Sequence, residues 1–112
     1  MLERDATETV RTYFDRILAG DPGVADVFHE DGNLIGLGKA TSGRPAIRAF
    51  YEDSIRNASP QPKLIGELLA AGPRVAAEIK ISLADGSDMH VVDLFVVESG
   101  KIRTLTYFVA DH

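Results

Sequence analysis

The chain of 112 residues contains no cysteine, which excludes disulfides, thiolate metal sites and cysteine nucleophiles. It also lacks any cluster of lysine and arginine, and its net charge is −5. Nucleic acids and anionic membrane surfaces bind to basic stripes, so neither partner is expected. No apolar run is long enough for a membrane span, and the charged segment Met1–Asp5 does not resemble a signal peptide. We therefore expect a cytoplasmic protein.

Common metal-binding and catalytic motifs are absent as well. The histidines His29, His90 and His112 show no metal-ligand spacing, and no glutamate accompanies them in a metalloprotease pattern. No Gly-x-Ser-x-Gly elbow supports a serine triad. The Gly-Leu-Gly segment at 36–38 lacks the third glycine and the strand-to-helix context of a dinucleotide-binding loop. We expect no metal and no cofactor.

The composition fits one domain that spans residues 1–112. The chain is 45% hydrophobic, which is enough for a core, but 112 residues are too few for two domains. It contains no repeat, linker or low-complexity segment. A single domain with at most one pocket is therefore expected.

Three helices are expected in the first half of the chain. Apolar residues at three- and four-residue spacings indicate the first helix, which should end at Gly20. Asp21-Pro22 starts a short second helix, because an N-cap side chain precedes proline at the first helical position. The third helix follows Pro45 and ends before the proline-containing stretch 59–62, which a helix interior cannot accommodate.

The second half of the chain is expected to form strands. Turn sequences that contain glycine separate four β-rich segments, namely residues 63–71, 74–84, 87–98 and 101–110. One of these turns, Asp85-Gly86, is a strong hairpin signal. A further strand is expected at 33–39, after a turn at Asp31-Gly32. The fold class is therefore α+β, with the helices packed on one face of a curved, mostly antiparallel sheet.

Asp93 is the most informative residue, because it is the one carboxylate in the apolar run His90–Val97. A carboxylate in such a run is rarely buried unless it is paired, protonated or functional. Apolar walls would hold it neutral and make it a hydrogen-bond donor, which suits the stabilisation of an oxyanion or enolate. The alternative is an aspartate that faces solvent or has a structural partner.

Alternation along this strand separates two largely apolar faces. One face carries Met89, Val91, Asp93, Phe95 and Val97, and the other carries His90, Val92, Leu94 and Val96. A strand covered on both sides suggests a cavity on one face and helices or a second subunit on the other, so a homodimer is expected. The alternative is that one face is ordinary core and no cavity exists.

Three parts of the sequence are similar to one known superfamily. They are Val10–Asp21 in the first helix, Ser42–Tyr51 in the third, and Val92–Phe95 followed by Ser99–Ile102 in the sheet. Together they resemble the ketosteroid isomerase branch of the NTF2-like, or SnoaL-like, superfamily, over nearly the whole chain. The resemblance implies a cone of curved antiparallel sheet, closed by three N-terminal helices around an apolar pocket.

The resemblance also implies catalytic roles for three residues. In ketosteroid isomerases, a tyrosine matching Tyr13 and a protonated aspartic acid matching Asp93 form an oxyanion hole for the dienolate oxygen. A second tyrosine, matching Tyr51, supports the first through a hydrogen bond. The family's general base, an aspartate on the first strand, is replaced here by Gly36. A general base contributes roughly a hundred- to ten-thousandfold in rate, so proton transfer is expected to be impaired or non-standard.

The ligand that the resemblance implies is a hydrophobic ketone or enolate, such as a steroid, a polycyclic compound or a terpenoid. The expected pocket walls are Ile17, Phe28, Gly36, Leu37, Val91, Phe95 and Phe108. Candidates for a substitute base are Asp31, Glu67 and His90, although His90 should point away from Asp93 because neighbours in a strand alternate faces.

Other functions remain open at this stage. The same cavity could serve a non-catalytic binding module, in which Gly36 leaves more room for the ligand. A protein-interaction module could use the sheet face that carries His90 and Val92. SnoaL-like cyclisation, dehydration or hydrolysis would use the same fold with a different reaction.

Overall fold

Helices dominate the first half of the chain and strands the second in the computed structural model, which describes residues 2–110. The elements follow in the order α1 (Leu2–Leu18), the short helix η1 (Pro22–Val27), β1 (Phe28–Gly36), β2 (Lys39–Ser42), α2 (Arg44–Ala58), β3 (Gln61–Leu64), β4 (Leu69–Ala71), β5 (Arg74–Ser82), β6 (Asp88–Glu98) and β7 (Lys101–Val109). His112 lies outside the described residues. No helix within residues 2–110 is long and apolar enough to cross a bilayer.

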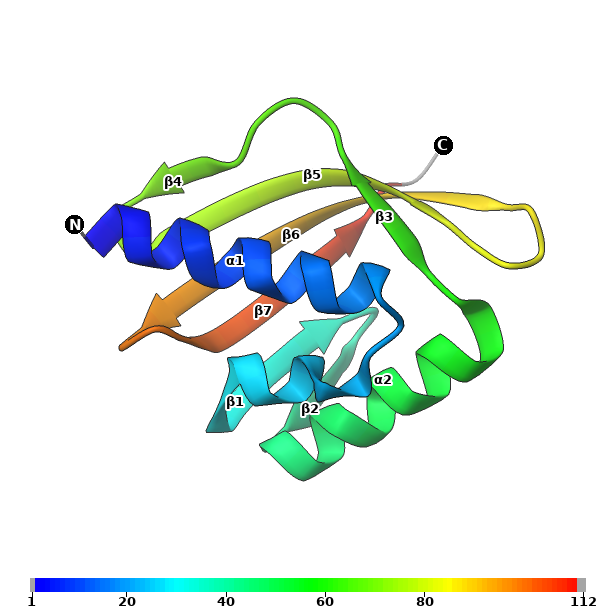
Figure 1. Ribbon diagram of the computed structural model, residues 1–112, viewed down its shortest axis with the longest axis horizontal. Helices are drawn as coiled ribbons and strands as arrows, with labels where there is room; N and C mark the ends of the chain where they lie inside the picture. Colours follow the sequence, from blue (N-terminus) through cyan, green and yellow to red (C-terminus); the bar gives the residue numbers. More distant parts are fainter. Residues whose placement is uncertain (1, 111–112) are drawn as a thin grey trace.

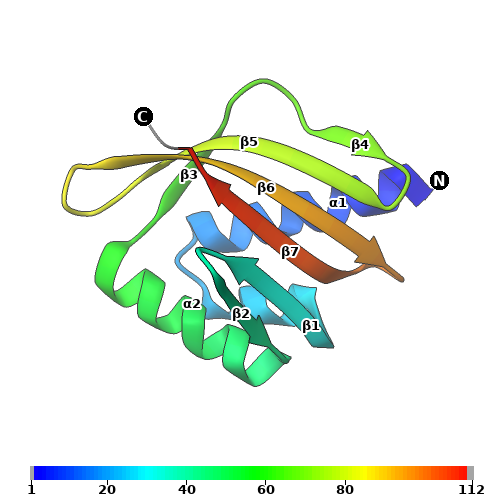
Figure 2. The same cartoon turned by 180° about the vertical axis from the view of Figure 1, so that it is seen from behind.

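A single curved sheet contains the seven strands of the described chain, in the order β2-β1-β7-β6-β5-β3, with β4 also paired to β5. All pairs are antiparallel except β1 with β7, which run parallel. Helices α1 and α2 cover one face of the sheet (Figure 1), whereas strands β5, β6 and β7 have no helix over them in the opposite view (Figure 2). The predicted α+β class with a curved, mostly antiparallel sheet is confirmed.

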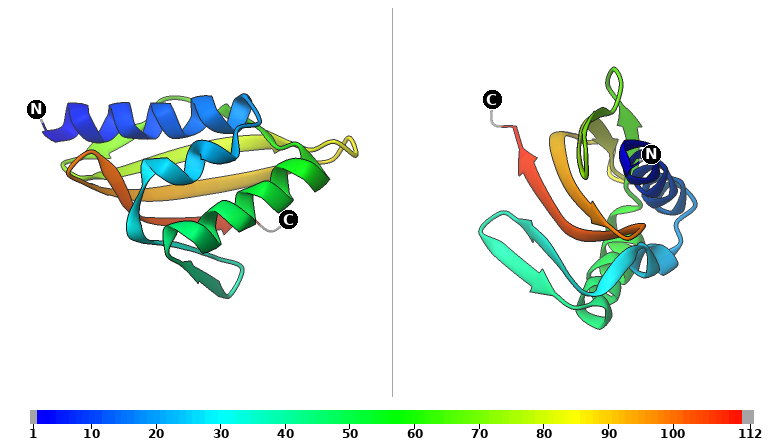
Figure 3. Two further views of the ribbon diagram at one scale, coloured as in Figure 1. Left: turned by 60° about the horizontal axis from the view of Figure 1, so that its bottom comes forward. Right: turned by 90° about the vertical axis from the view of Figure 1, so that its left-hand side faces the viewer.

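The sheet is curved into an open cone, and the helices lie against its concave side (Figure 3). Helix α1 turns Val10, Tyr13 and Ile17 towards the sheet, and all three are buried, as their helical spacing predicts. Helix α2 contributes Ile47 and Tyr51 to the same interior. The two helices therefore bring one tyrosine each into the space enclosed by the sheet.

Strand β6 confirms the alternation expected from the sequence. Val91, Asp93 and Phe95 are buried on the inner face, whereas His90 and Val92 are exposed on the outer face. The strand pairs with β5 on one side and β7 on the other, so its middle lies deep in the sheet. Asp93 is consequently fixed at the centre of the concave surface.

Three strand predictions were wrong. The strand expected at 33–39 is interrupted, because β1 ends at Gly36 and β2 begins at Lys39 after a turn. Asp31-Gly32 is not a turn, because both residues lie within β1, where the register against β7 shifts between Phe28 and Asn33. A Cβ at Gly32 would lie 3.1 Å from the backbone oxygen of Ile102, so the glycine allows a close approach of the strands. The segment 63–71 forms two short strands rather than one, since Gly66 has a positive φ of 75° between them.

Candidate functional site

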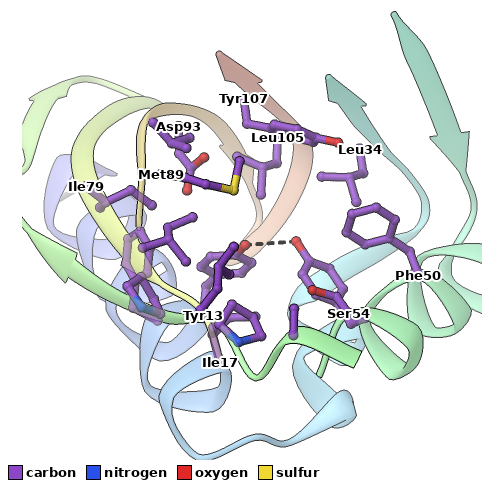
Figure 4. A pocket seen from close by; sticks show the side chains of 18 of the residues that line it. Tyr13, Ile17, Leu34, Phe50, Ser54, Ile79, Met89, Asp93, Leu105 and Tyr107 are labelled. Carbon is purple, nitrogen blue, oxygen red and sulfur yellow. Dashed lines mark hydrogen bonds between the residues drawn. The ribbon is translucent and has the colours of Figure 1, made fainter. Parts of the chain in front are cut away.

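A cavity of about 320 Å³ lies between the concave face of the sheet and the two long helices (Figure 4). Its volume is near the lower end of the range typical of small-molecule sites. Most of the lining side chains are apolar. The polar side chains that line it are Tyr13, Tyr51, Ser54, Asp93 and Tyr107. An apolar cavity with a few converging polar groups is the usual form of a ligand-binding site.

Tyr13 and Tyr51 form a hydrogen-bonded pair inside this cavity. Their hydroxyl oxygens lie 2.8 Å apart, and the residues are only 6% and 5% exposed. The Tyr13 ring is held in place by edge-to-face contacts with Phe28 and Phe95. Burial raises the pKa of both phenols, so both hydroxyls keep their protons near neutrality. One of the two hydroxyl protons forms the hydrogen bond between the tyrosines, so the other hydroxyl proton remains available for donation to a ligand.

Asp93 enters the cavity from the sheet without a partner. The residue is 5% exposed, and its side chain points towards the interior (Figure 4). No described residue donates a hydrogen bond to its carboxyl group. Burial raises the pKa of Asp93 to about 7, so the protonated acid is well populated near neutrality. A buried acid without a partner is costly unless a ligand group bonds to it.

Tyr107 is a cavity residue that the sequence analysis missed. It is the partner of Asp93 across the β6–β7 pair, and its ring covers Gly36 on β1. Gly36, the position expected for a general base, therefore does not line the cavity. Burial raises the pKa of the Tyr107 phenol, and the nearby Asp93 adds to this shift. Its position across from Asp93 could have been found only with the correct register of β7.

Apart from Gly36, the expected cavity walls divide into three groups, and the third consists of Phe108 alone. Ile17, Leu37 and Val91 line the cavity. Phe28 and Phe95 are fully buried beside the Tyr13 ring, where they support the wall instead of forming it.

Phe108 was wrongly expected in the wall, because it lies on the outer face and is 55% exposed. The register between β6 and β7 shifts by one residue between Val96 and Val97, which indicates a β-bulge. A bulge of one residue reverses the faces of all positions beyond it. The shift therefore turns Tyr107 inwards and Phe108 outwards.

The candidates for a substitute base lie outside the cavity. Asp31 accepts a hydrogen bond from Nη1 of Arg103 at 2.6 Å, and this bond lowers the pKa of the Asp31 carboxyl. Glu67 is exposed in the turn between β3 and β4. His90 lies on the outer face with its Nε2 2.7 Å from a carboxylate oxygen of Glu78. Among residues 2–110, Asp93 is thus the one carboxyl group that lines the cavity.

Metal ligands do not gather in this structure either. Within the described part of the chain, no group of three or more His, Asp or Glu side chains is arranged to hold a metal ion.

These features define a small α+β pocket protein in which a cone of sheet encloses an apolar cavity. The family model for the SnoaL-like domain matches residues 10–105, and the chain belongs to this family. No curated protein matches the chain in sequence.

Solved structures show the same fold. A protein from Sphaerobacter thermophilus is 25% identical, with a TM-score of 0.80 over 93% of this chain and 94% of that one. A protein from Kribbella flavida, provisionally named a ketosteroid isomerase, is 21% identical, with a TM-score of 0.87 over 98% and 81%. A provisionally named SnoaL-like polyketide cyclase from Jannaschia is 20% identical, with a TM-score of 0.80 over 96% and 87%. The last two likenesses are evidence of fold alone.

Proposed function

We propose that this protein binds an apolar ketone or enolate-like ligand of the steroid, polycyclic or terpenoid kind. Tyr13 and protonated Asp93 donate hydrogen bonds to the ligand oxygen. The observation that supports this most strongly is the buried Asp93 carboxyl, which points into an apolar cavity without a hydrogen-bond partner. The Tyr13–Tyr51 pair in the same cavity has a proton to spare. A carbonyl oxygen placed between these donors would satisfy both.

The same donors stabilise negative charge on the ligand oxygen. Tyr51 donates to Tyr13, which leaves the Tyr13 proton free to point at the ligand. Hydrogen bonds to a charged oxygen are about twice as strong as those to a neutral one. In an apolar site they are screened less than in water. The arrangement is therefore an oxyanion hole in which the ligand is bound more tightly as an enolate than as a ketone.

Proton transfer between two ligand carbons is the weak point of an isomerase mechanism in this cavity. Gly36 supplies no carboxylate, and Tyr107 covers it. We propose that isomerisation is slow and that binding is retained. SnoaL-like cyclisation, dehydration or hydrolysis is the second candidate. It is favoured by the pKa of Asp93, which is about 7 and suits a general acid that protonates a ligand oxygen.

We further propose that a second copy of the chain covers the outer face of the sheet. Ile35, Val92 and Phe108 are exposed apolar residues on this face, and Val92 is the direct cross-strand neighbour of Phe108. Neighbouring apolar groups of this kind are typical of a subunit interface. Light scattering should find a dimer that Phe108→Glu dissociates, whereas the matched change Leu18→Glu on α1 should not. A monomeric native protein would exclude the homodimer.

The binding proposal is tested by titration with equilenin, a phenolic steroid whose absorbance reports a strongly hydrogen-bonded phenolate. The native protein should perturb this absorbance, and Tyr13→Phe or Asp93→Leu should weaken the binding by about tenfold or more. Glu67→Gln on the exposed turn is the matched control and should bind normally. A parallel assay with a β,γ-unsaturated ketosteroid measures isomerisation. Absence of any absorbance change with native protein would refute the oxyanion hole.

A further inference from the structure

The contact between Gly36 and Tyr107 has a defined geometry. A Cβ placed on Gly36 would lie 2.5 Å from Cε1 of Tyr107, and slightly closer to Cζ and Cε2. A point almost equally distant from three consecutive ring atoms must lie above the ring and near its axis. The side-chain direction of Gly36 therefore meets the face of the Tyr107 ring and not its edge. The ring lies flat over the glycine, and its other face is turned towards the cavity that Tyr107 lines.

The position of this ring follows from the strand register. Tyr107 pairs with Asp93 on β6, and its neighbour Thr106 pairs with Ile35 on β1, beside Gly36. Tyr107 thus stands between the acid and the glycine in one row across the sheet. Its side chain extends away from Asp93 towards Leu34 (Figure 4). The Asp93 carboxyl and the Tyr107 ring consequently form two separate parts of the sheet-side wall.

Helix α2 supplies an aromatic side chain on the opposite side of the cavity. The Phe50 ring projects from this helix towards the region between Leu34 and Ser54 (Figure 4), and it lines the same cavity as Tyr107. A ligand whose oxygen is at Tyr13 and Asp93 would extend between the sheet-side Tyr107 ring and the helix-side Phe50 ring. Aromatic rings on both sides make this part of the cavity suitable for a flat ring.

We infer that Tyr107 determines ligand specificity by selecting a flat, unsaturated ring that lies against its exposed face. This inference rests on the proposed function, because the ligand oxygen must be held at Tyr13 and Asp93. Aromatic rings gain energy beyond simple burial when they stack or meet edge to face, whereas the out-of-plane hydrogens of a saturated ring prevent close stacking. Gly36 makes the selection possible, since any side chain there would push the Tyr107 ring into the ligand space.

A purely structural role for Tyr107 has to be distinguished from this one. An aromatic ring that covers a glycine on a neighbouring strand stabilises a sheet without any ligand. Loss of stability in a Tyr107 variant would therefore not support the inference. The decisive measurement is the preference between two ligands that share their polar end and differ only in the flatness of the distal ring.

Such a pair is β-naphthol and its tetrahydro derivative, in which the ring distal to the hydroxyl is saturated. Both present a phenolic hydroxyl to Tyr13 and Asp93, and the difference in their acidity cancels when the ratio is compared between variants. The ratio of their dissociation constants should change by about three- to tenfold in Tyr107→Leu, to the disadvantage of β-naphthol. Tyr107→Phe keeps the ring and should keep the native ratio. A cooperative thermal transition of both variants serves as the control that they are folded.

Each outcome of this experiment has a separate meaning. An unchanged ratio in Tyr107→Leu would overturn the inference and leave the proposed function intact. If Tyr107→Phe changes the ratio as much as Tyr107→Leu does, the inference would also be overturned, because the hydroxyl and not the ring face would then be responsible. Failure of the native protein to bind either phenol would refute the proposed function itself.

Discussion

The hydroxyl oxygens of Tyr13 and Tyr51 lie 2.8 Å apart, although the two residues come from different helices. Two phenols that share one hydrogen bond retain one proton between them for a further acceptor. Tyr13 can donate to a ligand only when Tyr51 donates to Tyr13. The order of donors, from Tyr51 to Tyr13 to the ligand, predicts unequal effects when each hydroxyl is removed.

Tyr13→Phe should weaken the binding of equilenin by roughly ten- to hundredfold, because it removes a hydrogen bond to a charged oxygen. Tyr51→Phe removes only the neutral bond behind it, so a loss of about two- to tenfold is expected. Fluorescence titration of both variants at one pH provides the comparison. A larger loss in Tyr51→Phe would show that the order of the two donors is reversed.

Asp93 should make the protein less stable as the pH rises. Burial raises its folded-state pKa to about 7, well above the value of an unfolded aspartate. Its contribution to stability is therefore fully present below pH about 4 and is lost as the pH rises through about 7. The free energy of unfolding should fall by about 2 to 3 kcal/mol between pH 5 and pH 8 from this group alone.

Urea denaturation of the native protein and of Asp93→Asn tests this dependence. The variant lacks the titrating group, so the difference between the two proteins should shrink or reverse on going from pH 5 to pH 8. NMR titration of the carboxyl carbon gives the pKa directly. An Asp93 that titrates near its ordinary value would contradict both the stability prediction and the proposed donor role.

The inward position of Asp93 could be predicted from the sequence because it depends on strand alternation alone. The run from His90 to Val97 has no glycine or proline, and β6 keeps one register against β7 from Val91 to Val96. The helical spacing of Val10, Tyr13 and Ile17 was equally reliable, since each helix turn repeats the same face. Both inferences needed only the residues of one element.

Tyr107 could not be predicted, because its orientation depends on a change of register between two strands. Counting back from the Ser99-Gly100 turn without a bulge would pair Asp93 with Thr106 and turn Phe108 inwards. The register shift between Val96 and Val97 pairs Asp93 with Tyr107 instead. No local sequence pattern marks this shift. The missed residue and the wrongly placed Phe108 are therefore two consequences of one bulge.

Ligand binding should depend on pH through the same carboxyl group. The affinity for a neutral steroid ketone should be constant below pH about 7, because protonated Asp93 then donates to the ketone oxygen. Above that pH the affinity should fall by up to tenfold per unit, as the ionised carboxylate repels the oxygen. In Asp93→Asn the amide donates at every pH, so calorimetry should give a flat profile. A pH-dependent profile in this variant would assign the effect to another group.

Gly36→Ala should destabilise the protein because of the Tyr107 ring and not because of backbone strain. The φ angle of Gly36 is not positive, so alanine fits the strand backbone, but its Cβ would overlap the ring. Overpacking of this kind costs about 1 to 3 kcal/mol. In a Tyr107→Ala background the overlap is absent, so alanine at 36 should be neutral or stabilise by about 0.5 to 1 kcal/mol.

The matched background for this cycle is Tyr107→Phe, which retains the ring and should retain the full cost of Gly36→Ala. Urea denaturation of the single and double variants gives the coupling free energy between the two positions. An equal cost of Gly36→Ala in the Ala and Phe backgrounds would show that the ring does not occupy this space. If Gly36→Ala is costly with Phe at position 107 but not with Ala, the Tyr107 ring is the group that occupies the space next to Gly36, where a base side chain would otherwise lie.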